Sequence, residues 1–294
     1  MRGELLIGSL VAGAIAGCNT GSAPGSTSAA TASSVPPAPP VSSSRSSVAS
    51  TVAHEHLTLV KAESGTTLPS DRAPLLTVSR TDLLLGDQSI AKVSPGPLGF
   101  APAQKRDGNA AALQITPLDD ALKALRQSDP TLDTARILLD AATPYRTTLE
   151  VFFTAAHAGF TGYDFLVSSP AGERALHIST PTRAQRKEAR AGNAPPSLAL
   201  VVQPDAFNLS IGSDAIGAGC IKDTTGSAVV RHGTPADLDA LVACTQRIRT
   251  MAPDWAGLAT VQLSAAPSVD AQAVLSVVAA MLPTFPQVYF GLLQ

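Results

Sequence analysis

The feature that most constrains the fold is a stretch of strand–helix–strand character over residues 136–167. A short apolar run leads into Asp140 and predicts the first strand. Thr143 offers a hydroxyl as helix N-cap, and Pro144 suits the first helical position, where its missing N–H costs nothing. Apolar residues then recur at helical spacing up to Gly159, which can take the left-handed conformation that ends a helix. The alternating residues that follow predict a second, half-buried strand, and a helix of this length can connect two parallel strands.

Composition narrows the classes of protein that this unit can belong to. The chain has 294 residues, of which 45% are hydrophobic, so it can bury a sizeable core in one or two domains. Its formal net charge of -2 gives no electrostatic footprint for nucleic acid. Aromatic residues make up only 4%, so stacking platforms for bases or sugars are scarce. We therefore expect no nucleic-acid partner.

The N-terminal residues 1–17 read as a targeting signal that should be kept out of the fold. An apolar run ends in Ile15-Ala16-Gly17-Cys18, which resembles the lipobox of bacterial lipoproteins. The resemblance implies cleavage before Cys18 and attachment of diacylglycerol to its thiol. The alternative is a plain signal peptide or an uncleaved anchor with an incidental cysteine. Residues 18–72 are rich in Ser, Ala, Pro and Thr, and their lack of apolar periodicity predicts a disordered tether.

The rest of the chain divides into two units joined by a linker. Residues 73–178 contain a strand or hairpin that turns near Gly86, a helix starting with the cap hydroxyl of Thr116, and the strand–helix–strand stretch. Residues 179–197 form a basic linker, and residues 198–294 repeat the same order of elements. In the alignment of the two units, the matching pairs are Val78 and Val202, Thr116 and Thr234, and Asp140 and Ser264.

With this order of elements, the first unit resembles the periplasmic domain of the ExbD/TolR family of biopolymer-transport proteins. The resemblance rests on three short motifs, namely Ile137-Leu138-Leu139-Asp140, Thr143-Pro144-Tyr145 and Ala158-Gly159. It implies an α+β fold with two tandem units, each a small β-sheet with two helices on one face. It also implies a periplasmic module that binds partners and dimerises. We expect the two units to pair within one chain, as two separate chains do in the family.

The chain departs from the family in two respects. The second unit has Ser264 in place of the aspartate and Val269 in place of the tyrosine. Family members also carry an N-terminal membrane helix with an acidic residue, which works with partner helices in using the proton gradient. Here the one acid of the N-terminal segment, Glu4, precedes the apolar run. Motor activity is therefore not carried over from the family.

Few residues suggest a chemical site. Asp140 and Tyr145, at a strand end and the following helix, are the candidates for contact with a ligand or partner. The alternative for Asp140 is that its carboxylate caps the turn. His157 lies near a helix end, and His177 falls in a predicted loop. No metal ligand set, cofactor fingerprint or nucleophile motif is recognised, so neither metal nor cofactor is predicted.

Two interpretations are possible for the remaining cysteines, Cys220 and Cys244. Export would place them in an oxidising compartment, where a structural disulfide between them is expected. The alternative is two buried free thiols. The disulfide is favoured because Cys18 is already explained by the lipobox.

These observations predict a non-enzymatic binding protein of the bacterial cell envelope that is lipid-anchored and faces the periplasm. Its partner would be another envelope protein, and one form of this role is an accessory to an energy-transducing or transport assembly. The leading mechanism is an edge strand, or the groove between units, accepting a partner segment. The alternative is a domain associated with peptidoglycan or another glycan, and a hydrolase is a third class.

Overall fold

The computed structural model describes residues 57–68, 72–94, 99–181, 185, 187, 196–222 and 225–291. The lipobox with Cys18, the tether up to residue 56 and most of the basic linker lie outside these residues. In the described ranges, no helix is both long and apolar enough to cross a membrane.

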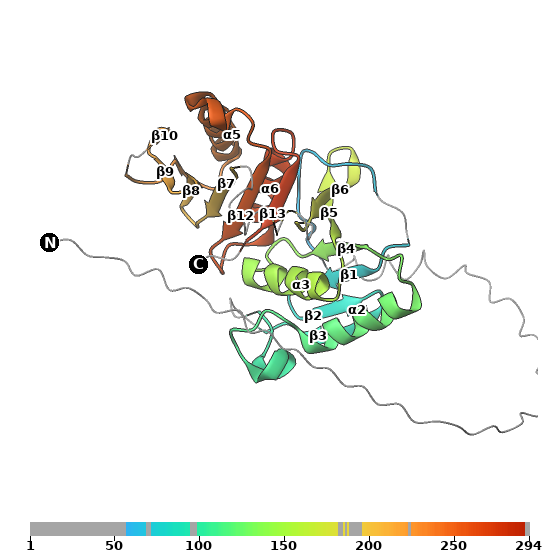
Figure 1. The fold of residues 1–294 in the computed structure, drawn as a ribbon. Helices are drawn as coiled ribbons and strands as arrows, with labels where there is room; N and C mark the ends of the chain where they lie inside the picture. Colours follow the sequence, from blue (N-terminus) through green and yellow to red (C-terminus); the bar gives the residue numbers. More distant parts are fainter. Residues whose placement is uncertain are drawn as a thin grey trace, which may run out of the picture. The chain divides into compact units, whose positions relative to one another are not determined.

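The described residues form two mixed β-sheets and four α-helices, which confirms the α+β class (Figure 1). The first sheet has the strand order β3-β2-β1-β4-β5-β6, in which β1, β4 and β5 are parallel and the other pairs antiparallel. Its strands are β1 (Leu75–Val78), β2 (Asp82–Leu85), β3 (Gln88–Lys92), β4 (Thr134–Leu139), β5 (Gly162–Ser169) and β6 (Gly172–Ser179).

The predicted hairpin has become a three-stranded meander. The first turn follows β1, where the Ser79 hydroxyl accepts the Asp82 N–H at 2.9 Å. The second turn uses Gly86 at φ 58°, a left-handed conformation that suits glycine. The sequence indicated this second turn. It did not indicate the first turn, which lies in a short polar segment between two apolar runs.

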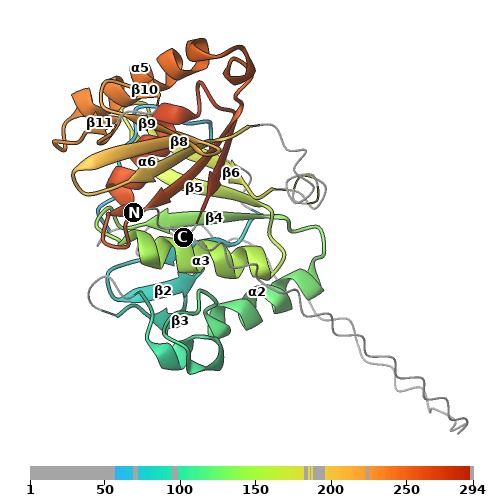
Figure 2. The same ribbon diagram turned by 60° about the vertical axis from the view of Figure 1, so that its left-hand side comes forward.

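Two helices, α2 (Thr116–Ser128) and α3 (Tyr145–His157), pack side by side on one face of the first sheet (Figures 1 and 2). The predicted hydroxyl caps at Thr116 and Thr143 are wrong, because neither helix start has a side-chain cap. The Thr143 hydroxyl is buried and finds no partner among the described residues. The first N–H of α3 instead donates to the carbonyl of Val269, a partner that local sequence could not indicate.

The second sheet has the order β10-β9-β8-β7-β12-β13, with β11 also paired to β8. Its strands are β7 (Leu198–Val202), β8 (Ala206–Ile211), β9 (Asp214–Gly217), β10 (Ile221–Lys222), β11 (Val229–Val230), β12 (Thr260–Ala265) and β13 (Gln287–Phe290). Helices α5 (Pro235–Met251) and α6 (Ala271–Met281) belong to the same half of the chain as this sheet, and they contact each other. The expected disulfide between Cys220 and Cys244 is confirmed and ties the end of the β9–β10 turn to α5.

The residues 57–66, here called the arm, extend the folded part beyond the expected start at residue 73. Bridges join the arm to the first sheet, between Leu59 and Asp140, Lys61 and Ser168, and Thr66 and Ala175. Its leucines pack on Leu138 and Leu166, on the face of the sheet away from the main core. The arm also reaches α6, where the Gln272 side chain bonds both backbone groups of Lys61 and the Ala279 carbonyl accepts the Ser64 hydroxyl. Strand β5 is therefore buried on both faces, whereas the sequence predicted a strand buried on one face only.

Candidate functional site

Asp140 lies at the carboxyl end of β4, the edge of a parallel sheet at which α/β proteins commonly bind ligands. Its side chain is only 3% exposed. One carboxylate oxygen accepts the Ala142 N–H at 3.0 Å and the Arg80 Nε–H at 3.3 Å. The other accepts the Thr58 N–H at 3.2 Å. The carboxylate thus closes its own turn and fastens the arm.

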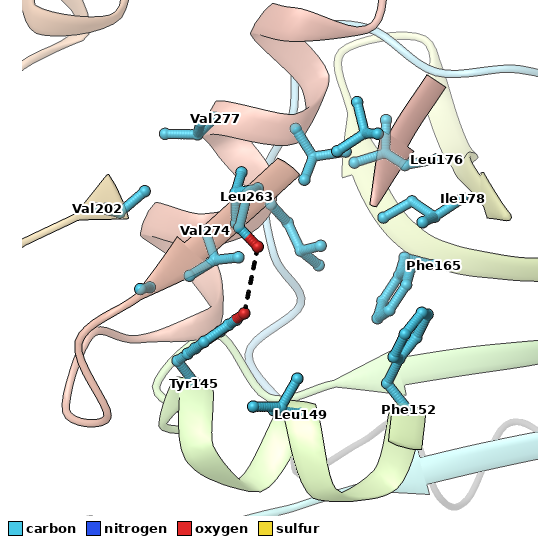
Figure 3. Packing of buried hydrophobic residues seen from close by; sticks show 14 of the residues in the cluster. Tyr145, Leu149, Phe152, Phe165, Leu176, Ile178, Val202, Leu263, Val274 and Val277 are labelled. Carbon is cyan, nitrogen blue, oxygen red and sulfur yellow. Dashed lines mark hydrogen bonds between the residues drawn. The ribbon is translucent and has the colours of Figure 1, made fainter. Parts of the chain in front are cut away.

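Tyr145 is the first residue of α3 and is 2% exposed. Its hydroxyl donates to the Gly291 carbonyl at 2.8 Å. It also approaches the Leu263 carbonyl at 3.4 Å, the contact drawn as a dashed line in Figure 3. Both carbonyls belong to the second half of the chain, since Leu263 lies in β12 and Gly291 follows β13. Burial raises the pKa of the Tyr145 phenol. The side chain therefore connects the first half of the fold to the second.

Backbone hydrogen bonds between the two halves are reciprocal. Tyr145 N–H donates to the Val269 carbonyl, and Ala271 N–H donates to the Thr143 carbonyl, both at 2.7 Å. One residue further along each helix, Arg146 donates to Pro267 at 3.2 Å and Gln272 donates to Ala141 at 2.9 Å. The loops before α3 and α6, residues 140–146 and 266–272, are here called the junction loops. Each helix start thus receives its missing acceptors from the other junction loop, as buried N–H groups require.

The strand ends show which residues of the two halves occupy matching places. The Asp140 N–H donates to the Val78 carbonyl, and the Ala266 N–H donates to the Val202 carbonyl, both at 2.9 Å. The residue that matches Asp140 in this pattern is therefore Ala266, and the expected match to Ser264 is wrong. The second half has no carboxylate at this place, and no counterpart of the Asp140 contact with the arm.

An aromatic cluster around Phe290 forms the apolar side of the junction, and Figure 3 shows three of its rings, those of Tyr145, Phe152 and Phe165. Phe290 of β13 lies edge-on to Tyr145, Phe152 and Phe165, with ring centroids 6.1, 5.1 and 5.6 Å apart. Such pairs stabilise packing beyond the area that they bury. Tyr145, Phe152 and Phe165 belong to one continuous hydrophobic core with aliphatic residues of both halves, and the partly buried Phe290 packs against it.

A buried ion pair that the sequence did not indicate supports α3. The Lys105 ammonium lies 2.6 Å from a Glu150 carboxylate oxygen, and these side chains are 1% and 0% exposed. The Arg146 guanidinium pairs with the same oxygen, and the other oxygen accepts the Phe100 N–H at 3.0 Å. Gly99, at φ 73°, must be glycine because a Cβ would lie 2.4 Å from Glu150. Glu150 thus holds the loop after β3 against the helix.

The two histidines considered from the sequence each pair with an aspartate. His157 Nδ1 lies 2.9 Å from Asp119, near the start of α2. Burial opposes ionisation of Asp119, but hydrogen bonds from Lys123 and His157 outweigh it and lower the pKa. His177 does not lie in a loop, as expected, but in β6, with Nδ1 2.8 Å from Asp164 on β5. This hydrogen bond raises the pKa of His177, against the opposing effect of burial.

We expect His177→Gln to lower stability at acidic pH and to have little effect at alkaline pH. The folded-state pKa of His177 is raised, so its contribution is complete below the unfolded value and disappears as pH rises through the folded value. The His177 side chain is 54% exposed, and this exposure limits the effect to about 1 kcal/mol. Urea unfolding at pH 5 and pH 9 measures it, with the exposed His232→Gln as control. An equal loss at both pH values would contradict the assignment.

Comparison with protein-family models finds no match to this chain, and comparison with curated proteins finds none either. In the part of the chain that the structure describes, no three His, Cys, Asp or Glu residues gather as a metal site. Asp140 and Tyr145, the two predicted contact residues, lie at the first position and near the last position of one junction loop, where Tyr145 begins α3. Their polar atoms are directed at the arm and at the second half. As arranged, these groups hold segments of the chain together.

Proposed function

We propose that the chain is a non-enzymatic, lipid-anchored binding protein of the bacterial cell envelope, built from two ExbD/TolR-like units paired within one chain. The observation that supports the proposal is the reciprocal bonding of the junction loops. Two units that exchange the same backbone bonds at equivalent helix starts behave as a dimer with two-fold-like symmetry. Joining them in one chain makes the pair independent of protein concentration.

The pairing also suggests how the protein meets a partner. The carboxyl edge of β4, where a free unit could bind a ligand, is covered by the arm and by the second junction loop. Partner contact is therefore assigned to outer edge strands, as in strand addition. In the second sheet β10 lies at one of the two edges, and its Ile221 is 47% exposed. In this proposal Asp140 and Tyr145 act by holding the binding surfaces in place.

The anchor gives a direct prediction. Cys18→Ser should move the protein from the membrane fraction to the soluble periplasmic fraction, because lipid attachment needs the thiol. Fractionation and labelling with a radioactive or clickable fatty acid measure both effects. Cys220→Ser combined with Cys244→Ser is the control, since these thiols are joined in the fold. Membrane retention of the Cys18→Ser protein without label would refute lipid anchoring.

The nature of the partner is tested by affinity capture from envelope extracts with and without muramidase treatment. We expect a protein partner to be captured equally in both extracts. Capture that disappears after muramidase treatment would support the peptidoglycan-associated alternative. Neither protein nor glycan capture, with a hydrolytic activity that Asp140→Ala abolishes, would overturn the non-enzymatic assignment.

A further inference from the structure

A cavity of about 480 Å³ lies in the second half of the fold, away from the junction loops. One wall is the β9–β10 hairpin, and the other is the end of α5 with the short 3-10 helix η3 (Pro253–Trp255). The lining residues are Asp214, Ile221, Lys222, Arg247, Met251, Ala252, Asp254 and Trp255.

Two of the four charged lining residues are already occupied. The Lys222 ammonium lies 2.9 Å from an Asp214 oxygen and 5.6 Å from the ring centroid of Trp255. The ring is 7% exposed, so it forms an apolar floor covered partly by this cation. These contacts shape the cavity and neutralise its hairpin wall.

The other two charges remain directed to solvent. Arg247 is exposed and donates one Nη1–H to the Gly219 carbonyl at 3.2 Å, which steadies the guanidinium and leaves its other donors available. Asp254 is exposed too, and within the described residues its carboxylate takes part in no hydrogen bond or ion pair. The helical wall thus presents one cation and one anion beside an apolar floor. Few polar groups around an apolar surface are typical of ligand pockets.

We propose that this cavity binds short peptides with free ends. The ligand carboxylate would pair with Arg247, whose planar fork matches it, and the ligand ammonium with Asp254. An apolar side chain between the two ends would rest on Trp255 and Met251. This site requires neither the lipid anchor nor the envelope partner proposed above.

The disulfide makes the cavity a preformed site. Cys220 directly precedes the hairpin residues Ile221 and Lys222, and Cys244 lies one helical turn before Arg247 on α5. The covalent bond therefore joins the two walls. A site held in its binding geometry loses less entropy when a ligand binds. Opening the bond should weaken binding even where the fold persists.

The proposal is tested by titrating the full chain with a tripeptide that has a central leucine and free ends. Chemical shift changes or calorimetry report binding. We expect either N-acetylation or C-amidation of the probe to weaken binding about twofold to fivefold, because the side chains that would meet the two ends are exposed to solvent. Saturable binding that ignores both modifications would overturn the assignment, as would no saturation up to about 10 mM, an affinity too weak for a site.

Variants then assign each end of the ligand. Arg247→Gln should weaken binding of the free tripeptide and remove the effect of C-amidation, while Asp254→Asn should remove the effect of N-acetylation. The matched control is Asp239→Asn, an exposed position on α5, the helix that carries Arg247. This variant should change neither the affinity for the free tripeptide nor the effects of N-acetylation and C-amidation. If Arg247→Gln stays sensitive to C-amidation, the carboxylate does not bind there.

The role of the disulfide is tested with the double variant Cys220→Ala and Cys244→Ala. We expect weaker tripeptide binding with the reciprocal amide signals of Ala271 and Gln272 unchanged, which shows that the fold persists. Unchanged affinity in this variant would overturn the preformed-site argument. If the variant does not fold, it is titrated in the presence of an osmolyte that restores the Ala271 and Gln272 amide signals, and unchanged affinity under these conditions would likewise overturn the preformed-site argument.

Discussion

Tyr145→Ala is expected to lower the free energy of unfolding by about 3–5 kcal/mol, the range for truncating a buried aromatic side chain. The substitution removes the ring contact with Phe290 and the hydrogen bond to the Gly291 carbonyl. Because both contacts cross between the halves, the loss should be visible first at the junction. Hydrogen exchange of the Ala271 and Gln272 amides measures it, alongside urea unfolding.

Two control variants separate the hydrogen bond from the ring and the junction from the core. Tyr145→Phe keeps the ring and should cost about 1–2 kcal/mol, since it leaves a buried carbonyl short of a donor. Tyr163→Phe removes a hydroxyl that donates to Phe160 at 2.7 Å within the first half. It should leave exchange at Ala271 unchanged. Equal protection of Ala271 in Tyr145→Ala and native protein would contradict a junction held by this side chain.

Glu150→Ala should destabilise the protein by about 3–5 kcal/mol, because it leaves the Lys105 ammonium buried without its counter-charge. The Phe100 N–H also loses its acceptor, so the loop after β3 should detach from α3. Urea unfolding measures the loss. Exchange at the Phe100 amide and proteolysis of the loop report the detachment.

The matched control removes both charges at once. Lys105→Met combined with Glu150→Met should be less destabilising than Glu150→Ala alone, because the two fully buried charges are removed together. The exposed pair between Lys92 and Asp82 provides a surface comparison, and Lys92→Met should cost about 1 kcal/mol or less. If the double variant is as unstable as the single one, the unpaired ammonium is not the source of the loss.

Features set by local sequence were predictable. Helical spacing indicated α3, and Gly159 does take a positive φ of 99° after it. The α+β class follows from the order of such elements, and the disulfide follows from counting cysteines in a chain that is expected to be exported. Each of these inferences rests on residues close together in sequence or on composition.

Features set by distant partners were not predictable. Thr143 has good N-cap chemistry, yet the α3 N–H groups bond to Val269 and Pro267. Lys105 lies in a loop rich in Pro and Gly, and nothing near it in sequence indicates its partner Glu150. The arm has only Leu57 and Leu59 as an alternating signal, within a stretch dominated by small and polar residues. The burial of Asp140 and Tyr145 could be recognised only in the folded structure, because the segments that cover them are distant in sequence.

The position of the arm has a mechanical consequence. A pull on the chain from its N-terminal side reaches the fold first at Thr58, which is bonded to Asp140 at the end of β4. Further along the arm, Val60 and Ala62 bond to Ser168 of β5, while Lys61 and Ser64 bond to Gln272 and Ala279 of α6. Load from this side is therefore shared between the two halves, and the aromatic contacts of Phe290 are shielded until the arm peels away.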